Sequence, residues 1–74
     1  MQDDKIRDFM RNQPFMPFYI RTTDGRVYEV DHPDFIARSR DGKTVSYYAP
    51  EDNRLVVIDA RHIVALELVN KSAA

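Results

Sequence analysis

The chain contains no cysteine and only two glycines among its 74 residues. Without cysteine, neither a disulfide nor a thiolate metal site can form. Both glycines follow an aspartate, at Asp24-Gly25 and Asp41-Gly42, so there is no glycine-rich phosphate loop. No apolar run approaches the ~18 residues of a membrane span, and the start Met1-Gln2-Asp3-Asp4 lacks a signal-peptide pattern. We therefore expect a cytoplasmic protein.

A large excess of charge of either sign is also lacking. The formal net charge is −1, from 11 basic and 12 acidic residues, which argues against a general binder of polyanions. The length allows one domain over residues 1–74. A chain this short buries only about 60% of its unfolded surface, so a second chain covering apolar surface would add stability.

The clearest local signal lies between Phe18 and Val30. Two runs of alternating β-formers flank Asp24-Gly25, and such a pair marks a hairpin because glycine adopts the positive φ of the tight turn. Before it, Ile6, Phe9 and Met10 have helical spacing and predict a short helix over residues 3–12 that docks through this stripe.

The rest of the chain predicts further short strands. Pro33 marks a bend, after which residues 35–39 continue the second strand, and Asp41-Gly42 gives a second turn. The remaining elements are strands over 44–49 and 54–59, a short connection over 60–62, a strand over 63–69 and a frayed tail over 70–74. We expect a mainly β fold, with the helix covering one open end of a five-stranded, strongly bent antiparallel sheet or small barrel over 18–69. The apolar run Leu55 to Ile58 predicts a central strand.

This order of elements resembles the Sm-like family of small, SH3-like barrels, which includes bacterial RNA chaperones. Residues 58–64 are similar to the second Sm motif, and Arg61-His62 to the Lys-His pair of the bacterial members. Asp59 replaces the motif's arginine and Ala60 its glycine. The resemblance implies the fold, and RNA binding through Arg61, His62 and Tyr47 if the function is shared.

A second resemblance covers nearly the whole chain. A family of short, uncharacterised bacterial proteins has the pattern I-R-x-F, P-F-x-P-F, D-G-R, H-P-x-F and a late I-D. The matching segments here are 6–9, 14–18, 24–26, 32–35 and 58–59. This resemblance implies no activity.

Two histidines lie near carboxylates. His32, between Asp31 and Asp34, has the chemistry of a metal ligand or proton shuttle, but a solvated turn with a local aspartate cap is the simpler interpretation. Asp59 and His62 are a candidate acid–base pair. In the simpler interpretation, Asp59 caps the short turn and His62 is a rim residue. No positioned nucleophile accompanies them, and we predict no catalytic residue, metal or cofactor.

Basic residues alternate with tyrosines along the predicted strands: Arg21, Arg26, Arg38, Arg40, Lys43, Arg54 and Arg61, with Tyr19, Tyr28, Tyr47 and Tyr48. Small barrels hold single-stranded nucleic acid with such residues, whereas cross-strand pairing with acidic neighbours is the simpler interpretation.

We therefore expect a non-enzymatic interaction module that binds itself or another protein through strand edges, above all those of residues 54–59 and 63–69. An Sm-like RNA-binding protein is the alternative, and a small metal-dependent enzyme or accessory subunit is the third possibility.

Overall fold

A computed structural model describes residues 3–69 and is mainly β. One helix precedes six antiparallel strands, which form two sheets in the orders β2-β1-β6 and β3-β4-β5. The elements are α1 (Asp3–Met10), β1 (Phe18–Thr22), β2 (Val27–Val30), the 3₁₀ turn η1 (Pro33–Phe35), β3 (Ile36–Arg38), β4 (Thr44–Ala49), β5 (Arg54–Asp59), η2 (Ala60–His62) and β6 (Ile63–Leu68). The tail expected over 70–74 lies outside the described residues.

The expected single bent second strand is two strands, so the count of five was wrong. Pro33 begins η1 and has no N–H for a ladder. His32 precedes it in an extended conformation, and its Nδ1 accepts a hydrogen bond of 3.1 Å from the Asp34 N–H. This cap stabilises a turn that separates β2 from β3, and the two three-stranded sheets do not close into a barrel.

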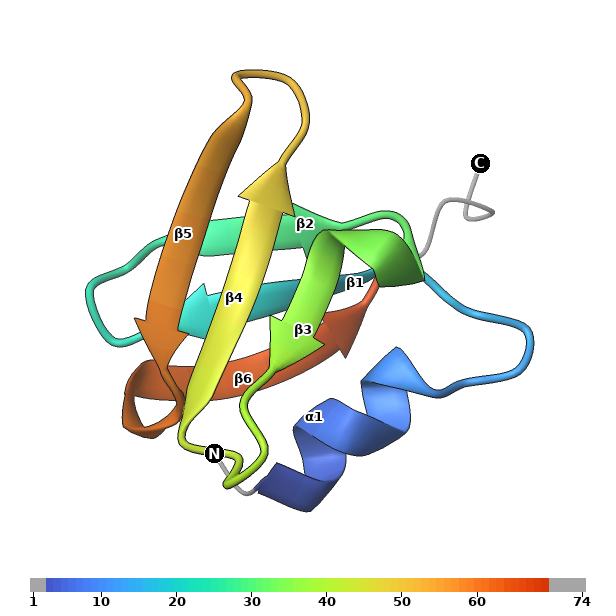
Figure 1. The fold of residues 1–74 in the computed structure, drawn as a ribbon, viewed down its shortest axis with the longest axis horizontal. Helices are drawn as coiled ribbons and strands as arrows, with labels where there is room; N and C mark the ends of the chain where they lie inside the picture. Colours follow the sequence, from blue (N-terminus) through green and yellow to red (C-terminus); the bar gives the residue numbers. More distant parts are fainter. Residues whose placement is uncertain (1–2, 70–74) are drawn as a thin grey trace.

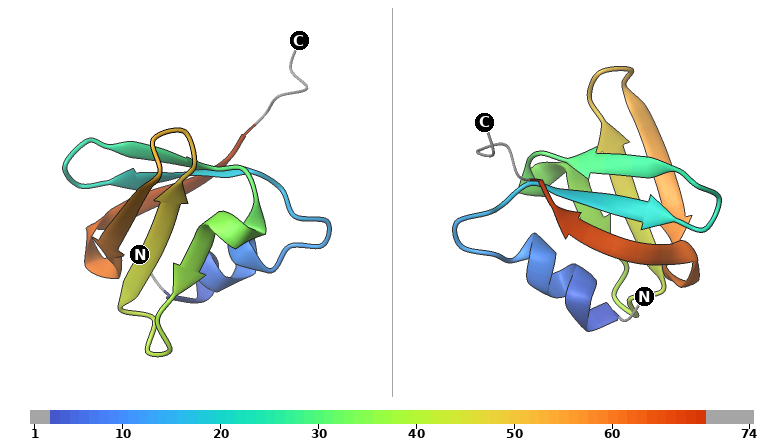
Figure 2. Two further views of the ribbon diagram at one scale, coloured as in Figure 1. Left: turned by 45° about the horizontal axis from the view of Figure 1, so that its top comes forward. Right: turned by 180° about the vertical axis from the view of Figure 1, so that it is seen from behind.

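The two sheets cross each other, and the chain passes between them at two corners (Figure 1). η1 joins β2 to β3 at one corner, and η2 joins β5 to β6 at the other. Figure 2 shows α1 beside β6 and β3, where it covers one side of the space between the sheets. No helix among residues 3–69 has the length and apolar composition to cross a membrane.

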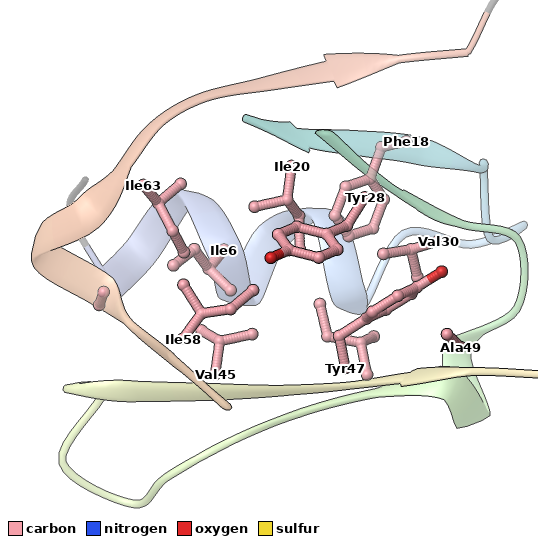
Figure 3. Close-up of a cluster of buried hydrophobic side chains, with 12 residues drawn as sticks. Ile6, Phe18, Ile20, Tyr28, Val30, Val45, Tyr47, Ala49, Ile58 and Ile63 are labelled. Carbon is pink, nitrogen blue, oxygen red and sulfur yellow. The ribbon is translucent and has the colours of Figure 1, made fainter. Parts of the chain in front are cut away.

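The core fills the space between the sheets and reaches α1 (Figure 3). Ile6 is 1% exposed, and the Phe9 ring packs edge-on against Phe18 with centroids 5.1 Å apart. Met10 is partly buried against the same cluster. The docking stripe predicted for the helix is therefore confirmed, although α1 ends at Met10 rather than at residue 12.

The strand expected to be central, β5, lies at a sheet edge. It pairs with β4 and with no other strand of the described chain. Ile58 faces the core and is 5% exposed, whereas Leu55 and Val57 are 66% and 64% exposed. The apolar run was misleading because only one face of β5 packs against the other sheet, so the apolar residues of the other face meet solvent.

Candidate functional site

Two clefts lie side by side where β2 and the β1–β2 hairpin face β4 and β5. The first cleft has a volume of about 450 Å³ and lies between β2 and the β4–β5 turn. The second cleft has a volume of about 280 Å³ and lies between the hairpin turn, β5 and η2. Tyr28 lines both clefts, so it is the wall that they share.

Two tyrosines of the core contribute to the lining of the first cleft. Tyr28 and Tyr47 are 9% and 6% exposed, and their ring centroids lie 5.5 Å apart. The Tyr47 hydroxyl donates a hydrogen bond of 2.8 Å to the carbonyl of Glu29. Burial raises the pKa of Tyr47, and the carboxylates of Glu51 and Asp31 add to that rise. The rim carboxylates therefore lie close enough to act on the Tyr47 hydroxyl.

Four carboxylates line the first cleft, those of Glu29, Asp31, Glu51 and Asp52, together with one cation, Arg54. The Arg54 guanidinium lies 3.6 Å from a carboxylate oxygen of Asp52. Its positive charge therefore mainly offsets the negative charge of Asp52. Among the described lining residues, carboxylates therefore outnumber cations, although the whole chain is nearly neutral.

The second cleft is closed at one end by contacts between the hairpin and η2. The Thr23 N–H donates to the carbonyl of His62 at 2.8 Å, and the Thr23 hydroxyl lies 3.1 Å from His62 Nδ1. Val56, Val57 and Ile58 supply the apolar wall. The backbone and side chain of His62 therefore hold the hairpin turn against the corner between β5 and β6 through Thr23.

Asp59 caps η2 and is not hydrogen-bonded to His62. Its Oδ1 accepts from the Arg61 N–H at 2.9 Å, and its Oδ2 accepts from Arg61 Nη2 at 2.8 Å. The hydrogen bonds from the Arg61 side chain and backbone lower the pKa of Asp59 far below its ordinary value. A carboxylate held ionised in this way is a poor general acid, which supports the turn-cap interpretation.

The structure separates the three residues proposed from the Sm-like resemblance. Arg61 and His62 are exposed neighbours in η2, and His62 lines the second cleft. Tyr47 lines the first cleft and is almost buried. A common role of these residues in binding nucleic acid stays a prediction.

The other histidine candidate, His32, has a local role in the cap of η1, where the ring, and not an aspartate, accepts the Asp34 N–H. Among residues 3–69, no group of three or more histidines or carboxylates has an arrangement that could hold a metal ion.

Sequence reasoning missed the acidic cleft. Glu29 lies in the second strand of the hairpin and Asp31 directly after it, whereas Glu51 and Asp52 lie in a turn some twenty residues later. We expected such acidic residues to pair with arginines across strands. One signal in the sequence could have indicated the cleft. Each pair of acidic residues lies in or shortly after a predicted strand that carries a tyrosine, Tyr28 or Tyr47.

Comparison with known proteins gives no identification: no family model, no curated protein and no solved structure matches the chain. Both family resemblances drawn from the sequence therefore stay predictions.

Proposed function

We propose that the protein is a non-enzymatic interaction module that self-associates through the free edges of β5 and β6. The observation that supports this most directly is the exposure of Leu55 and Val57, at 66% and 64%, on a strand that has a partner on one side only within the described chain. An exposed apolar edge strand is a template for pairing with another chain.

The second free edge belongs to β6. This strand pairs with β1, and its Val64 and Leu68 are 58% and 49% exposed. Neither β5 nor β6 contains a proline or lysine that would block pairing. Antiparallel addition of β6 to β5 of a neighbour would supply main-chain hydrogen bonds and bury these side chains.

We further propose that the fold is an open relative of the Sm-like and SH3-like barrels. The interrupted second strand, the 3₁₀ turn before the last strand and the helix beside the core support this relation. In Sm-like proteins, the edges of the last two strands pair between subunits, so the proposed edges are the ones that this relation implies.

Light scattering of the full chain at high micromolar concentration tests self-association. We expect a mass above that of one chain for the unchanged protein, and a monomer mass for Leu55→Lys and for Val57→Lys. Met16→Lys is the matched control, because Met16 is also a large exposed apolar residue, 46% exposed, but lies outside the strands. A monomeric unchanged protein, or equal dissociation in all three variants, rejects the proposal.

RNA binding is the second candidate, because the Arg61 side chain is 86% exposed beside His62 in η2. Arg61 already pairs with Asp59, and the formal net charge of the chain is −1, so we expect no tight binding of generic single-stranded RNA at physiological salt. A salt-sensitive submicromolar complex in fluorescence anisotropy that Arg61→Ala and His62→Ala both weaken would favour this candidate instead. The cytoplasmic location stays a prediction of the sequence.

A further inference from the structure

The second cleft contains one polar side chain that the described part of the chain leaves without a hydrogen bond. The other polar side chains of its lining all have partners within the protein: Thr22, Thr23, Asp24, Asp59 and His62. Tyr28 is the exception, because its hydroxyl makes no hydrogen bond with any described residue. Buried hydroxyl groups usually have such a partner, so this one is available to a bound molecule.

The Tyr28 hydroxyl opens into the second cleft. Tyr28 is only 9% exposed, yet no side-chain oxygen or nitrogen of residues 3–69 is both fully buried and without a hydrogen bond. The phenol oxygen is therefore accessible from outside. Figure 3 shows it pointing toward Ile58, which lines the same cleft, whereas the Tyr47 hydroxyl points in the opposite direction. A buried ring thus presents a single hydrogen-bonding group in the cleft.

The wall that β5 contributes to this cleft is apolar. Val56 is partly buried against the core, Ile58 is 5% exposed, and Val57 is 64% exposed. An apolar wall with few convergent polar groups is typical of sites for organic ligands. The volume of about 280 Å³ is close to the lower limit of such sites, about 300 Å³. The cleft therefore fits one side chain better than a larger ligand.

The carboxylates of the lining already have cationic partners. Asp24 lies 3.4 Å from the Arg26 guanidinium, and Asp59 lies 2.8 Å from that of Arg61. A charged group that entered the cleft would lose hydration without meeting a free opposite charge. The guest that suits this cleft is therefore neutral, with an apolar stem and one group that can pair with a phenol.

The second cleft lies along the free edge of β5, which points to a peptide as the source of this group. The Ser39 N–H donates to the Thr44 carbonyl at 2.8 Å, so the main chain of Thr44 faces β3 and that of Val45 faces β5. Val45 lies opposite Ile58, and main-chain groups alternate in direction along a strand. The N–H and carbonyl of Val57 therefore face the free edge, where a peptide backbone can pair with them.

We propose that the second cleft binds the side chain of a glutamine in a peptide segment of a partner protein, with the carboxamide oxygen accepting a hydrogen bond from the Tyr28 hydroxyl. The two methylene groups of the glutamine lie against Val56 and Ile58 and lose contact with water. A glutamate has the same shape but brings a charge. A methionine has a similar length but leaves the Tyr28 hydroxyl without a partner.

The inference rests on the proposed function in one respect, that β5 offers a free edge to other chains. Leu55→Lys separates the two proposals, because Leu55 does not line the second cleft. This variant is expected to be monomeric and to bind the glutamine peptide at least as tightly as the unchanged protein. An unchanged protein that is monomeric but binds the peptide rejects self-association alone. Association of the unchanged protein without peptide binding by Leu55→Lys rejects the inference alone.

The test is a titration of the ¹⁵N-labelled full chain, unchanged and as Leu55→Lys, with a blocked pentapeptide that has glutamine between alanines. Control peptides have glutamate or methionine in its place. We expect millimolar binding, since one side chain and a short backbone segment provide the contacts. The glutamine peptide should shift the amide signals of residues 22–24, 56–59 and 62, and the controls should shift them less. Butyramide, the same group without a backbone, should bind more weakly.

Tyr28→Phe removes only the hydroxyl and no hydrogen bond within the described chain. Its unfolding midpoint in urea should therefore equal that of the unchanged protein. It should weaken binding of the glutamine peptide by about three- to tenfold, the usual effect of one neutral hydrogen bond, and leave the methionine peptide unaffected. Tyr48→Phe is the matched control, because the Tyr48 hydroxyl bonds to Asn53 and Tyr48 lies outside the cleft lining. It should bind the glutamine peptide as the unchanged protein does.

Five results overturn the inference. Three concern the peptides: equal binding of the glutamine and methionine peptides, equal binding of butyramide, or no shift at residues 22–24 and 56–59 at millimolar concentration. The fourth is equal weakening by Tyr28→Phe and Tyr48→Phe. The fifth is a urea midpoint that falls as far in Tyr28→Phe as in Tyr47→Phe, because the Tyr28 hydroxyl would then have a partner within the chain.

Discussion

The hydroxyl of Tyr47 on β4 donates a hydrogen bond of 2.8 Å to the carbonyl of Glu29 on β2. This bond joins the two sheets through β2, which is an edge strand that pairs only with β1 in the described chain. It also gives the Tyr47 hydroxyl a hydrogen-bond partner, which matters because this side chain is only 6% exposed. One tyrosine therefore supports both the packing of the sheets and the shape of the first cleft.

Tyr47→Phe is expected to lower the free energy of unfolding by about 1–2 kcal/mol, because it keeps the ring and leaves the Glu29 carbonyl without this partner. Urea denaturation measures the change. Tyr48→Phe is the matched control, since the Tyr48 hydroxyl bonds to the exposed Asn53 at 2.9 Å, where water can replace it. Equal stability of the two variants would show that the hydroxyl of Tyr47 does not join the sheets.

Gly25→Val is expected to destabilise the protein by roughly 1 kcal/mol or more, because Gly25 has a φ of 82° in the β1–β2 turn. A Cβ at this position would meet no atom within 4 Å, so the cost comes from the backbone conformation and not from a clash. Gly25→Asn should cost less, since asparagine tolerates positive φ. Thermal denaturation followed by circular dichroism compares them, and equal melting temperatures of Gly25→Val and the unchanged protein contradict the argument.

Local patterns predicted the elements that depend on neighbouring residues. Both Asp-Gly turns are confirmed, with Gly25 and Gly42 at φ of 82° and 74°. The spacing of Ile6, Phe9 and Met10 gave the docking face of α1. These signals are reliable because backbone geometry and helical periodicity are set within a few residues.

One error was local, because Pro33 and the His32 cap end the second strand at η1, where we expected only a bend. The others arose where distant segments meet, since the pattern could not show which strand would lie at an edge. Leu55 to Ile58 looked central because apolar residues follow one another, but burial depends on what faces each side. The first cleft was missed for the same reason: Tyr28 and Tyr47 meet only when the sheets cross.

Ile6→Ala is expected to lower the free energy of unfolding by about 3 kcal/mol, because Ile6 is 1% exposed and its truncation leaves a cavity between α1 and the sheets. This is a large part of the stability of a small domain. Lys5→Ala changes the exposed face of the same helix and should have little effect. If deletion of residues 1–12 leaves the unfolding midpoint in urea unchanged, α1 does not stabilise the sheets.

Acidification is expected to destabilise the protein below about pH 4, and Asp59 contributes to this loss. The Arg61 hydrogen bonds lower the pKa of Asp59 in the folded protein below its ordinary value of 3.8. The ionised carboxylate therefore stabilises the fold above that value, and the contribution is lost as the pH falls further, because the unfolded chain binds the proton first. Asp24 and Asp41 act in the same direction, through the hydroxyls of Thr22 and Ser39.

Melting temperatures measured between about pH 5 and about pH 2 test this argument. Asp59→Asn keeps an oxygen that can cap η2 but does not bind a proton in this pH range, so its melting temperature should fall less steeply on acidification. Arg61→Ala removes the side-chain donor that lowers the pKa of Asp59 most, and it should also flatten the curve while lowering stability near neutral pH. If both variants follow the slope of the unchanged protein, the Asp59–Arg61 pair makes no pH-dependent contribution to folding.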